Sequence, residues 1–123
     1  MAVVELTAEN FKDTIDGNGI VVVDYWAPWC APCRSFAPTF EDAAERNPDI
    51  TFAKINTEDE GELATTFQIR SIPTLMIFRE RVIIFQQAGV LPGKALDELI
   101  EQAKDIDMEK VHAEVKGEGA SVD

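Results

Sequence analysis

The chain has 123 residues, of which 46% are hydrophobic and 28% are charged, and its 11 Lys and Arg against 23 Asp and Glu give a formal net charge of −12. Because one domain commonly has about 100 to 150 residues, this length predicts a single acidic domain and excludes two domains. The negative charge repels phosphate backbones and anionic lipid, so we expect no nucleic-acid partner and no membrane partner.

Neither a membrane-spanning segment nor a leader is visible in the sequence. No stretch approaches the roughly 20 apolar residues that a membrane helix needs, and the densest apolar stretches, 20–26 and 75–78, have the length of strands. The first six residues contain neither a basic leader nor a long apolar segment, which favours a cytoplasmic location. A leader removed beforehand would give the same sequence.

A short helix and a central strand are predicted first. Thr7 precedes residues 8–14 in the manner of an N-cap. Residues 20–26 are almost all β-branched or aromatic, which is typical of a strand covered on both faces. Helices should therefore lie on both sides of the sheet.

A second helix and a second strand follow. The segment 33–46 has helical periodicity with Pro38 inside it, and the missing backbone N–H predicts a kink. Residues 50–55 predict a strand, which a right-handed crossover makes a parallel neighbour of the first strand. The spacing of Thr57 and Glu60 is that of a capping box before another short helix.

The next elements are a hairpin and an amphipathic helix. Residues 74–78 and 82–85 predict antiparallel strands, but the link 79–81 contains neither Gly nor Asn, so a longer or strained turn is expected. Apolar residues then recur at helical spacing at Leu96, Leu99, Ile100 and Ala103.

The pattern becomes weaker near the end of the chain. We assign residues 1–104 to the domain and 105–123 to an acidic extension that is partly helical or disordered. Apolar residues at Met108, Val111 and Val115 could extend a helix. Residues 117–123 are small and polar, and we expect them to be mobile.

The only two cysteines, Cys30 and Cys33, form a local pair rather than a disulfide framework. A ring this short would restrict the unfolded chain by only about 2 kcal/mol, so stability explains the pair poorly. The pair lies where the first central strand meets a helix, whose free N–H groups and positive dipole end favour a thiolate at Cys30. Pro32 suits the first helical turn, and Cys33 should be the more covered sulfur.

Zinc ligation and an inert pair are the alternatives to a redox role. Zinc needs four ligands, and the only histidine is His112, near the end of the chain, where we expect a solvated side chain. An inert pair fits poorly with a helix N-terminus. We therefore expect a redox pair and no metal site.

Asp24 interrupts an apolar strand, where an unpaired buried carboxylate is costly and its pKa should rise. Lys54 is the matching anomaly in the next parallel strand, so the two side chains could interact. One hypothesis makes Asp24 a proton acceptor and donor for Cys33, with Lys54 tuning it. The other makes the two a structural ion pair.

Several further residues have two interpretations. Pro73 precedes a strand, and most such prolines follow a trans bond. Trp29 belongs either to the core or to a surface contact beside the cysteines. We expect solvated charges at Arg34, Arg70, Arg79 and Arg81, of which only Arg34 is held near the thiols by sequence.

Three segments, residues 23–34, 52–56 and 70–75, resemble the thioredoxin family. The similarity runs in order from about residue 6 to residue 104. It implies an α/β protein with the thioredoxin fold, in which a central mixed β-sheet is flanked by helices on both faces. Ala31 differs from the family's usual Gly, so the motif reads WCAPC in place of WCGPC.

The resemblance implies a role for each matching residue. Cys30 would attack a substrate disulfide and Cys33 would resolve the mixed disulfide. Asp24 corresponds to the family's buried acid and Lys54 to its companion. Pro73 corresponds to a cis-proline, and the backbone beside it would pair with an extended substrate. The implied substrate surface consists of Trp29, Pro32, Ile72, Pro73, Gly89 and Val90.

The resemblance also implies the reaction and the partners. The chain would be a thiol-disulfide oxidoreductase that reduces disulfide-containing proteins and receives electrons from a flavin-dependent, NADPH-using thioredoxin reductase. No cofactor would be bound to this chain, which we expect to be a monomer.

Two departures from the family leave alternatives open. Ala31 should slightly change access and redox poise, and Arg79-Glu80-Arg81 replaces a turn that usually holds Gly. A protein-binding module with incidental cysteines is one alternative. An oxidant or isomerase with a shifted redox potential is the other.

Overall fold

The computed structural model describes the backbone of residues 2–122 and the side chains of residues 2–115. Its elements are, in chain order, β1 (Val3–Glu5), α1 (Phe11–Gly17), β2 (Ile20–Trp26), α2 (Ala31–Arg46), β3 (Thr51–Asn56), α3 (Gly61–Thr66), β4 (Thr74–Arg79), β5 (Val82–Ala88), α4 (Gly93–Asp105) and α5 (Met108–Val122).

The strands form one mixed sheet in the order β1-β3-β2-β4-β5, which confirms the predicted fold class. β1 and β2 both run parallel to β3, whereas β4 is antiparallel to β2 and β5 is antiparallel to β4. The predicted parallel pairing of the first two central strands is therefore confirmed. The edge strand β1 was not predicted, because three residues are too few to show a strand pattern.

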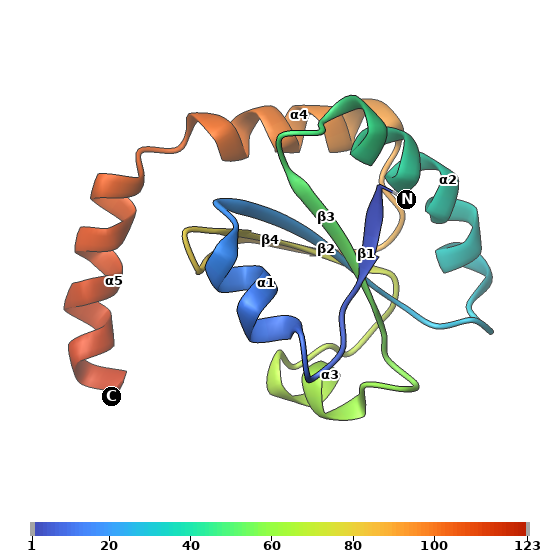
Figure 1. The fold of residues 1–123 in the computed structure, drawn as a ribbon, viewed down its shortest axis with the longest axis horizontal. Coiled ribbons are helices and arrows are strands. Elements are labelled where there is room, and N and C mark those ends of the chain that lie inside the picture. The colour runs from blue at the N-terminus through green and yellow to red at the C-terminus, as the bar shows by residue number, and fades with distance from the viewer. Residues whose placement is uncertain (1, 123) are drawn as a thin grey trace.

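Helices cover both faces of the sheet, as the apolar sequence of β2 predicts (Figure 1). Val22 faces α2 and α4 in a cluster with Phe36, Phe40, Leu96 and Ile100. Val21, Val23 and Tyr25 face the opposite way, toward Ile15 of α1 and the partly buried Leu63 of α3. Each such fully buried aliphatic side chain contributes about 1.5–3 kcal/mol to folding. β2 is thus held rigidly between two cores.

The two short helices correct details of the sequence prediction. α1 begins at Phe11, not at residue 8, because the Asn10 side chain accepts a hydrogen bond from Thr7 N (2.7 Å) and holds residues 8–10 in a turn. The capping box before α3 is wrong. Thr57 Oγ1 instead donates to Trp26 O (3.1 Å), and Glu60 Oε1 accepts from Ala8 N (2.9 Å).

The other predicted elements are found with small shifts of their ends. Pro38 lies inside α2, as predicted, while the kink stays a prediction. α4 buries Leu96, Ile100 and Ala103, which confirms its amphipathic pattern. Within the described backbone, no helix is both long enough and apolar enough to span a membrane.

The β4–β5 turn is a tight two-residue turn in a conformation that its residues disfavour. Glu80 has φ 51° and Arg81 has φ 71°, both in the left-handed region. Such a conformation costs a residue other than glycine roughly 1–2 kcal/mol. This confirms the expected strained connection and excludes a longer one.

We expect Arg81→Gly to stabilise the protein by about 0.5 kcal/mol, because glycine relieves the left-handed conformation but gains entropy in the unfolded chain. The urea midpoint should rise. The control is Glu101→Gly in the interior of α4, where φ is not positive and glycine should cost about 1 kcal/mol. Equal losses in both variants would show that the turn stores no strain.

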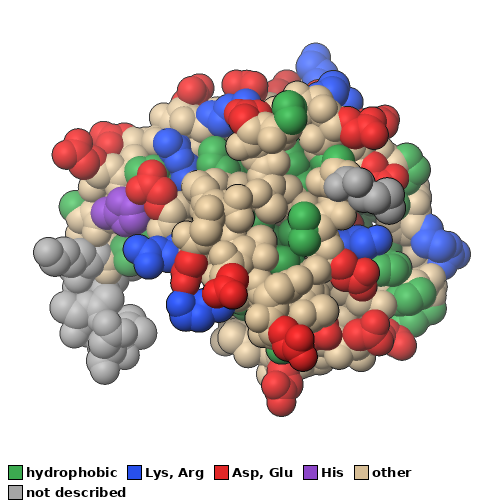
Figure 2. All heavy atoms as spheres, in the orientation of Figure 1, with side chains coloured by type: hydrophobic (Ala, Val, Ile, Leu, Met, Phe, Trp, Pro, Cys, Tyr) green, Lys and Arg blue, Asp and Glu red, His purple; other side chains and the backbone are tan. Residues whose placement is uncertain are grey.

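α5 continues beyond α4 and packs beside the β4–β5 turn, so the predicted helix through Met108, Val111 and Val115 is confirmed. His112 is exposed, as predicted (Figure 2, purple), and its Nε2 lies 2.7 Å from Glu80 Oε1. Arg79, in contrast, is not merely solvated. Its Nη1 donates to the carbonyls of Ala103, Lys104 and Ile106. Helix α5 extends to Val122. The predicted mobility of residues 117–123 lies outside the described side chains. The domain boundary at residue 104 stays a prediction.

Candidate active site

The two cysteines form a disulfide at the N-terminus of α2, with their Cα atoms 5.2 Å apart. Cys30 is the N-cap in an extended conformation, and Ala31 and Pro32 form the first turn. Cys33 N donates to Cys30 Sγ at 3.2 Å. In the reduced protein, the same N–H and the positive end of the helix would stabilise a thiolate at Cys30. The predicted position at a strand-to-helix junction is confirmed.

Cys30 lies against a loop from a distant part of the chain. Its Sγ is 3.8 Å from Ile72 O, and the Ile72–Pro73 peptide bond is cis, as the family resemblance implied. Pro73 O accepts a hydrogen bond from Gly89 N (2.8 Å), and Gly89 has φ 99°, a conformation that favours glycine. Ile72 therefore lies against Cys30, and a backbone hydrogen bond joins Gly89 to the neighbouring Pro73.

Cys33 faces the interior and shares a pocket of about 80 Å³ with Asp24, Trp26, Lys54 and Glu41, which we call the Asp24 pocket. The exposed fractions of Cys30 and Cys33 are 4% and 2%. Cys33 is the more buried of the two, as predicted, but the difference is small. Alternation along β2 turns Asp24 to the same face as Val22, toward α2. The pocket thus joins the inner sulfur to the buried acid.

Asp24 is buried and poorly compensated. Only 4% of it is exposed, and its Oδ1 has no hydrogen-bond partner. Burial raises the pKa of the Asp24 carboxyl from 3.8 to about 7, and the positive charge of Lys54 lowers it by a smaller amount. The carboxyl can therefore take up or release a proton near neutral pH.

Lys54 is the register partner of Asp24 on β3, but the two form no ion pair in the described part of the chain. Its Nζ lies 5.0 Å from the centre of the Trp26 ring, in a cation–π contact. The nearby Trp26 Nε1 is buried without a hydrogen-bond partner. This arrangement therefore does not support the hypothesis that Asp24 and Lys54 form a structural ion pair.

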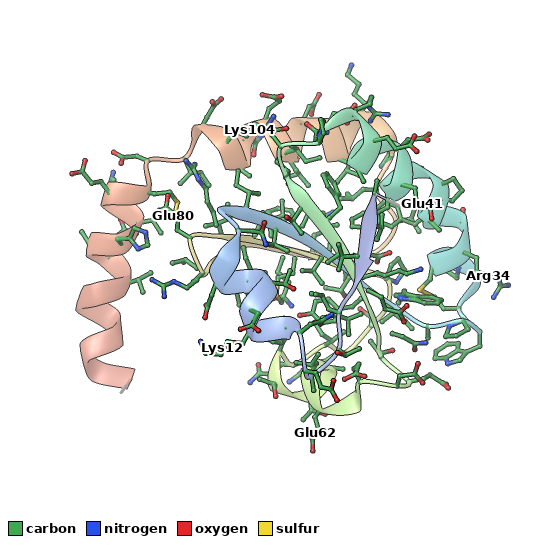
Figure 3. All side chains as sticks on the ribbon, in the orientation of Figure 1. Lys12, Arg34, Glu41, Glu62, Glu80 and Lys104 are labelled. Carbon is green, nitrogen blue, oxygen red and sulfur yellow. A yellow bond between two sulfur atoms is a disulfide. The ribbon has the colours of Figure 1, made fainter. Side chains whose placement is uncertain are left out.

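Several residues that the sequence predicts for the substrate surface are exposed. Trp29 is 65% exposed and its Nε1 donates to Glu58 Oε1, so Trp29 belongs to the surface and not to the core. Pro32 is exposed in the first turn of α2, and Val90 is 47% exposed. Arg34 extends from the start of α2 (Figure 3), where its Nη1 donates to Pro28 O (2.8 Å).

Sequence reasoning missed two acidic residues in this region. Glu58 bonds Trp29, and its own N–H donates to Asn56 Oδ1 (3.0 Å). Nothing in the local pattern indicates this contact across 29 residues. Glu41 lines the Asp24 pocket and was detectable, because it lies eight residues after Cys33 and so on the same face of α2.

Metal binding finds no support in the described residues. No group of three or more His, Cys, Asp or Glu side chains there is arranged to hold a metal ion. The sulfurs are engaged with each other, and His112 pairs with Glu80. The arrangement fits reversible disulfide exchange, in which one sulfur can be attacked and the other can leave.

Comparisons with known proteins agree with this chemistry. The thioredoxin family model matches residues 2–114. The chain is 53% identical over 112 residues to "Putative thioredoxin 2" of Streptomyces coelicolor, covering 91% of this chain and 84% of that protein. It is 41% identical to a thioredoxin of Alicyclobacillus acidocaldarius, covering 78% of this chain and 92% of the relative. A solved mutant thioredoxin of Halobacterium salinarum superposes with a TM-score of 0.78 at 28% identity, covering 85% and 93% of the two chains.

The matched region contains the whole sheet, the disulfide and the Asp24 pocket. Similarities in sequence and in fold therefore coincide with a redox-active cysteine pair at the expected helix terminus. The chain belongs to the thioredoxin family of protein-disulfide oxidoreductases.

Proposed function

We propose that this thioredoxin works mainly as a reductant of protein disulfides, with Cys30 as nucleophile and Cys33 as resolving thiol. The Cys30 thiolate attacks one substrate sulfur, and the other substrate sulfur leaves as a thiolate. Cys33 then attacks Cys30, which releases the second substrate sulfur and forms the Cys30–Cys33 disulfide. The observation that carries this order is the N–H of Cys33 donating to Cys30 Sγ, since it favours a thiolate on the outer residue.

Asp24 serves as the proton acceptor for Cys33 in this proposal. Its carboxyl shares a pocket with Cys33, its Oδ1 lacks a hydrogen-bond partner, and its pKa is raised to about 7. A base is most effective when its pKa lies near the working pH. Lys54 lies in the same pocket, and its positive charge lowers the pKa of Asp24.

The substrate surface combines Trp29, Pro32, Ile72, Pro73 and Val90 around Cys30, with Gly89 supporting Pro73. A shallow groove of about 210 Å³ between Trp29 and Ile72 lies beside it. An extended peptide would pair with the backbone at Ile72, whose carbonyl faces Cys30 Sγ. The exposed side chains of Trp29, Pro32 and Val90 support such a contact, whereas Ile72 is half-buried and Pro73 is buried.

The electron donor is proposed to be an NADPH-dependent, flavin-containing thioredoxin reductase, and the site of action to be the cytoplasm. The family relationship supports both. The chain needs no cofactor of its own for dithiol exchange, and it is proposed to act as a monomer.

The test is NADPH-coupled reduction of insulin with a thioredoxin reductase. We expect catalytic NADPH consumption that depends on this chain, and no turnover would reject the proposal. Equilibration of the Cys30–Cys33 pair with a glutathione buffer separates a reductant from an oxidant or isomerase. For a reductant, we expect that only a large excess of reduced glutathione reduces the Cys30–Cys33 disulfide.

A further inference from the structure

Helix α5 takes no part in the site of the two cysteines, and it is joined to the body of the protein at the end of β4. After α4 the chain turns, and α5 runs along one side of the molecule (Figure 1). Arg79 is the last residue of β4. Its Nη1 donates to three carbonyls where α4 ends and the link to α5 begins, those of Ala103, Lys104 and Ile106. The base of α5 is therefore anchored to the sheet by one side chain.

The first turn of α5 is held by the link that precedes it. Asp107 Oδ1 accepts hydrogen bonds from the N–H groups of Glu109 (3.1 Å) and Lys110 (3.3 Å), as an N-cap does. Met108, between them in the sequence, is buried. This turn of the helix therefore depends on the link and not on the β4–β5 turn.

Farther along α5, the described side chains make one polar contact with the sheet, and its partner is the β4–β5 turn. His112 Nε2 lies 2.7 Å from Glu80 Oε1, and both side chains are nearly half exposed. Figure 3 shows Glu80 at this turn, beside α5. Glu80 has φ 51°, a conformation that glycine adopts at lower cost but without a side chain. The turn thus carries a side chain that reaches α5 at a position that disfavours one.

One helical turn beyond His112, α5 forms a wall of an apolar groove. The groove has a volume of about 530 Å³, and its walls include Phe11 of α1, Ile83 of β5 and Val115 of α5. Ile83 is 43% exposed and Val115 is 40% exposed, so the groove is open to solvent. Residues three apart lie on the same face of a helix. The contact of His112 with the turn therefore determines how closely Val115 approaches β5.

The strength of this contact depends on the charge of His112. A histidine ordinarily changes its charge between about pH 5 and pH 8. Protonated His112 forms an ion pair with the Glu80 carboxylate, whereas neutral His112 forms a weaker hydrogen bond. Arg81 of the turn and Asp16 of α1 line the same hollow as His112, and Asp16 is paired within its own helix. Glu109 lies one turn before His112 on α5. Among these groups, Glu80 is the one that bonds His112.

We propose that the Glu80–His112 pair is a pH-sensitive latch, which holds α5 against the β4–β5 turn at mildly acidic pH and loosens it at alkaline pH. Arg79 keeps the base of α5 in place in both states, so loosening is a local opening beyond Ile106 that widens the apolar groove. An exposed ion pair shifts such an equilibrium about two- to fivefold. The latch lies at the other end of β4 from Pro73, and it does not rest on the proposed disulfide exchange.

The first test is amide hydrogen exchange of residues 110–115 in the intact oxidised protein, corrected for the intrinsic exchange rate. In Glu80→Gln, these amides should exchange about two- to fivefold faster than in the wild type at pH 5.5. At pH 8 the ratio should fall below about 1.5, because the wild type has then lost the ion pair as well. Gln keeps the size of Glu at the turn, so the substitution changes the charge and little else.

Two control variants show whether the effect belongs to this pair. Glu114→Gln removes the same charge from α5 two residues farther along, on a different face of the helix, and should leave exchange unchanged. His112→Gln removes the only histidine, and in this background Glu80→Gln should have the same small effect at both pH values. The latch is wrong if Glu80→Gln does not accelerate exchange, if it does so equally at both pH values in the wild-type background, or if Glu114→Gln has the same effect.

A second measurement asks whether the latch moves the wall of the groove. The methyl NMR signals of Ile83 should shift between pH 5.5 and pH 8 in the wild type. At pH 5.5, Glu80→Gln should move these signals toward their positions at pH 8, and Glu114→Gln should not. If the Ile83 signals of Glu80→Gln and the wild type coincide at pH 5.5, α5 does not open the groove and the proposed opening is wrong.

Discussion

Replacing Cys30 by Ser is expected to reduce insulin reduction to the rate without the protein. A serine hydroxyl has no thiolate to offer at neutral pH, and it cannot form the mixed disulfide on which both steps depend. The fold should persist, because a three-residue bridge contributes little to stability and the two cores lie elsewhere. The measurement is NADPH consumption with a thioredoxin reductase and excess insulin.

The matched variant is Cys33→Ser, which removes the second sulfur and keeps the first. It should attack one substrate molecule and then stop, so a covalent adduct should accumulate that is sensitive to dithiothreitol. Mass spectrometry identifies the adduct at Cys30. Full turnover by Cys30→Ser, or an adduct on Cys33 in the wild type, would contradict the assigned order of the two sulfurs.

The sequence predicts most of the fold because its signals there are strong and local. The continuous β-branched run of β2 indicates a strand between two layers, and its two faces contact the two helical layers as expected. The positions of Cys30 and Cys33 follow from the same pattern, since a strand followed by a helix fixes where the helix terminus lies. Residues whose positions in the fold depend on their neighbours in the sequence are thus well predicted.

What the sequence does not predict depends on contacts between distant segments. The capping-box spacing of Thr57 and Glu60 is genuine, but both side chains find better partners at Trp26 and Ala8. The buried Asp24 suggests an ion pair with Lys54 at the matching register position, yet the ammonium lies over an indole ring instead. Spacing fixes which residues are neighbours, and packing decides which of them interact.

Replacing Asp24 by Asn is expected to stabilise the oxidised protein, and the gain should depend on pH. The pKa of Asp24 is about 7 in the folded protein and 3.8 in its reference state, so the folded state binds the proton more tightly. The contribution of this carboxyl to the free energy of unfolding is therefore most favourable below about pH 4. It falls as the pH rises from 4 to 7, and above pH 7 it no longer changes. A difference of about three pKa units corresponds to at most about 4 kcal/mol above pH 7.

Urea unfolding of wild type and Asp24→Asn at pH 4 and pH 8 measures this gain. Asn has the same shape and no charge, so the two proteins should differ little at pH 4, while the variant should be more stable by about 2–4 kcal/mol at pH 8. Asp42→Asn on the exposed face of α2 serves as the control for loss of one negative charge. An equal difference at both pH values would show that the Asp24 carboxyl is not the cause.

The same substitution should slow the resolution of the mixed disulfide, because Asn cannot accept the proton of Cys33. General-base catalysis contributes about 10²–10⁴-fold, and a solvent-assisted route through the pocket limits the loss to the lower end of that range. We expect the single-turnover rate at pH 7.5 to fall about a hundredfold, while the first attack by Cys30 stays within about twofold of wild type. The loss should shrink at higher pH, as Cys33 ionises without help. If the resolution rate of the wild type does not change between pH 6 and pH 9, Asp24 has no chemical role and is only a buried carboxyl that lowers stability.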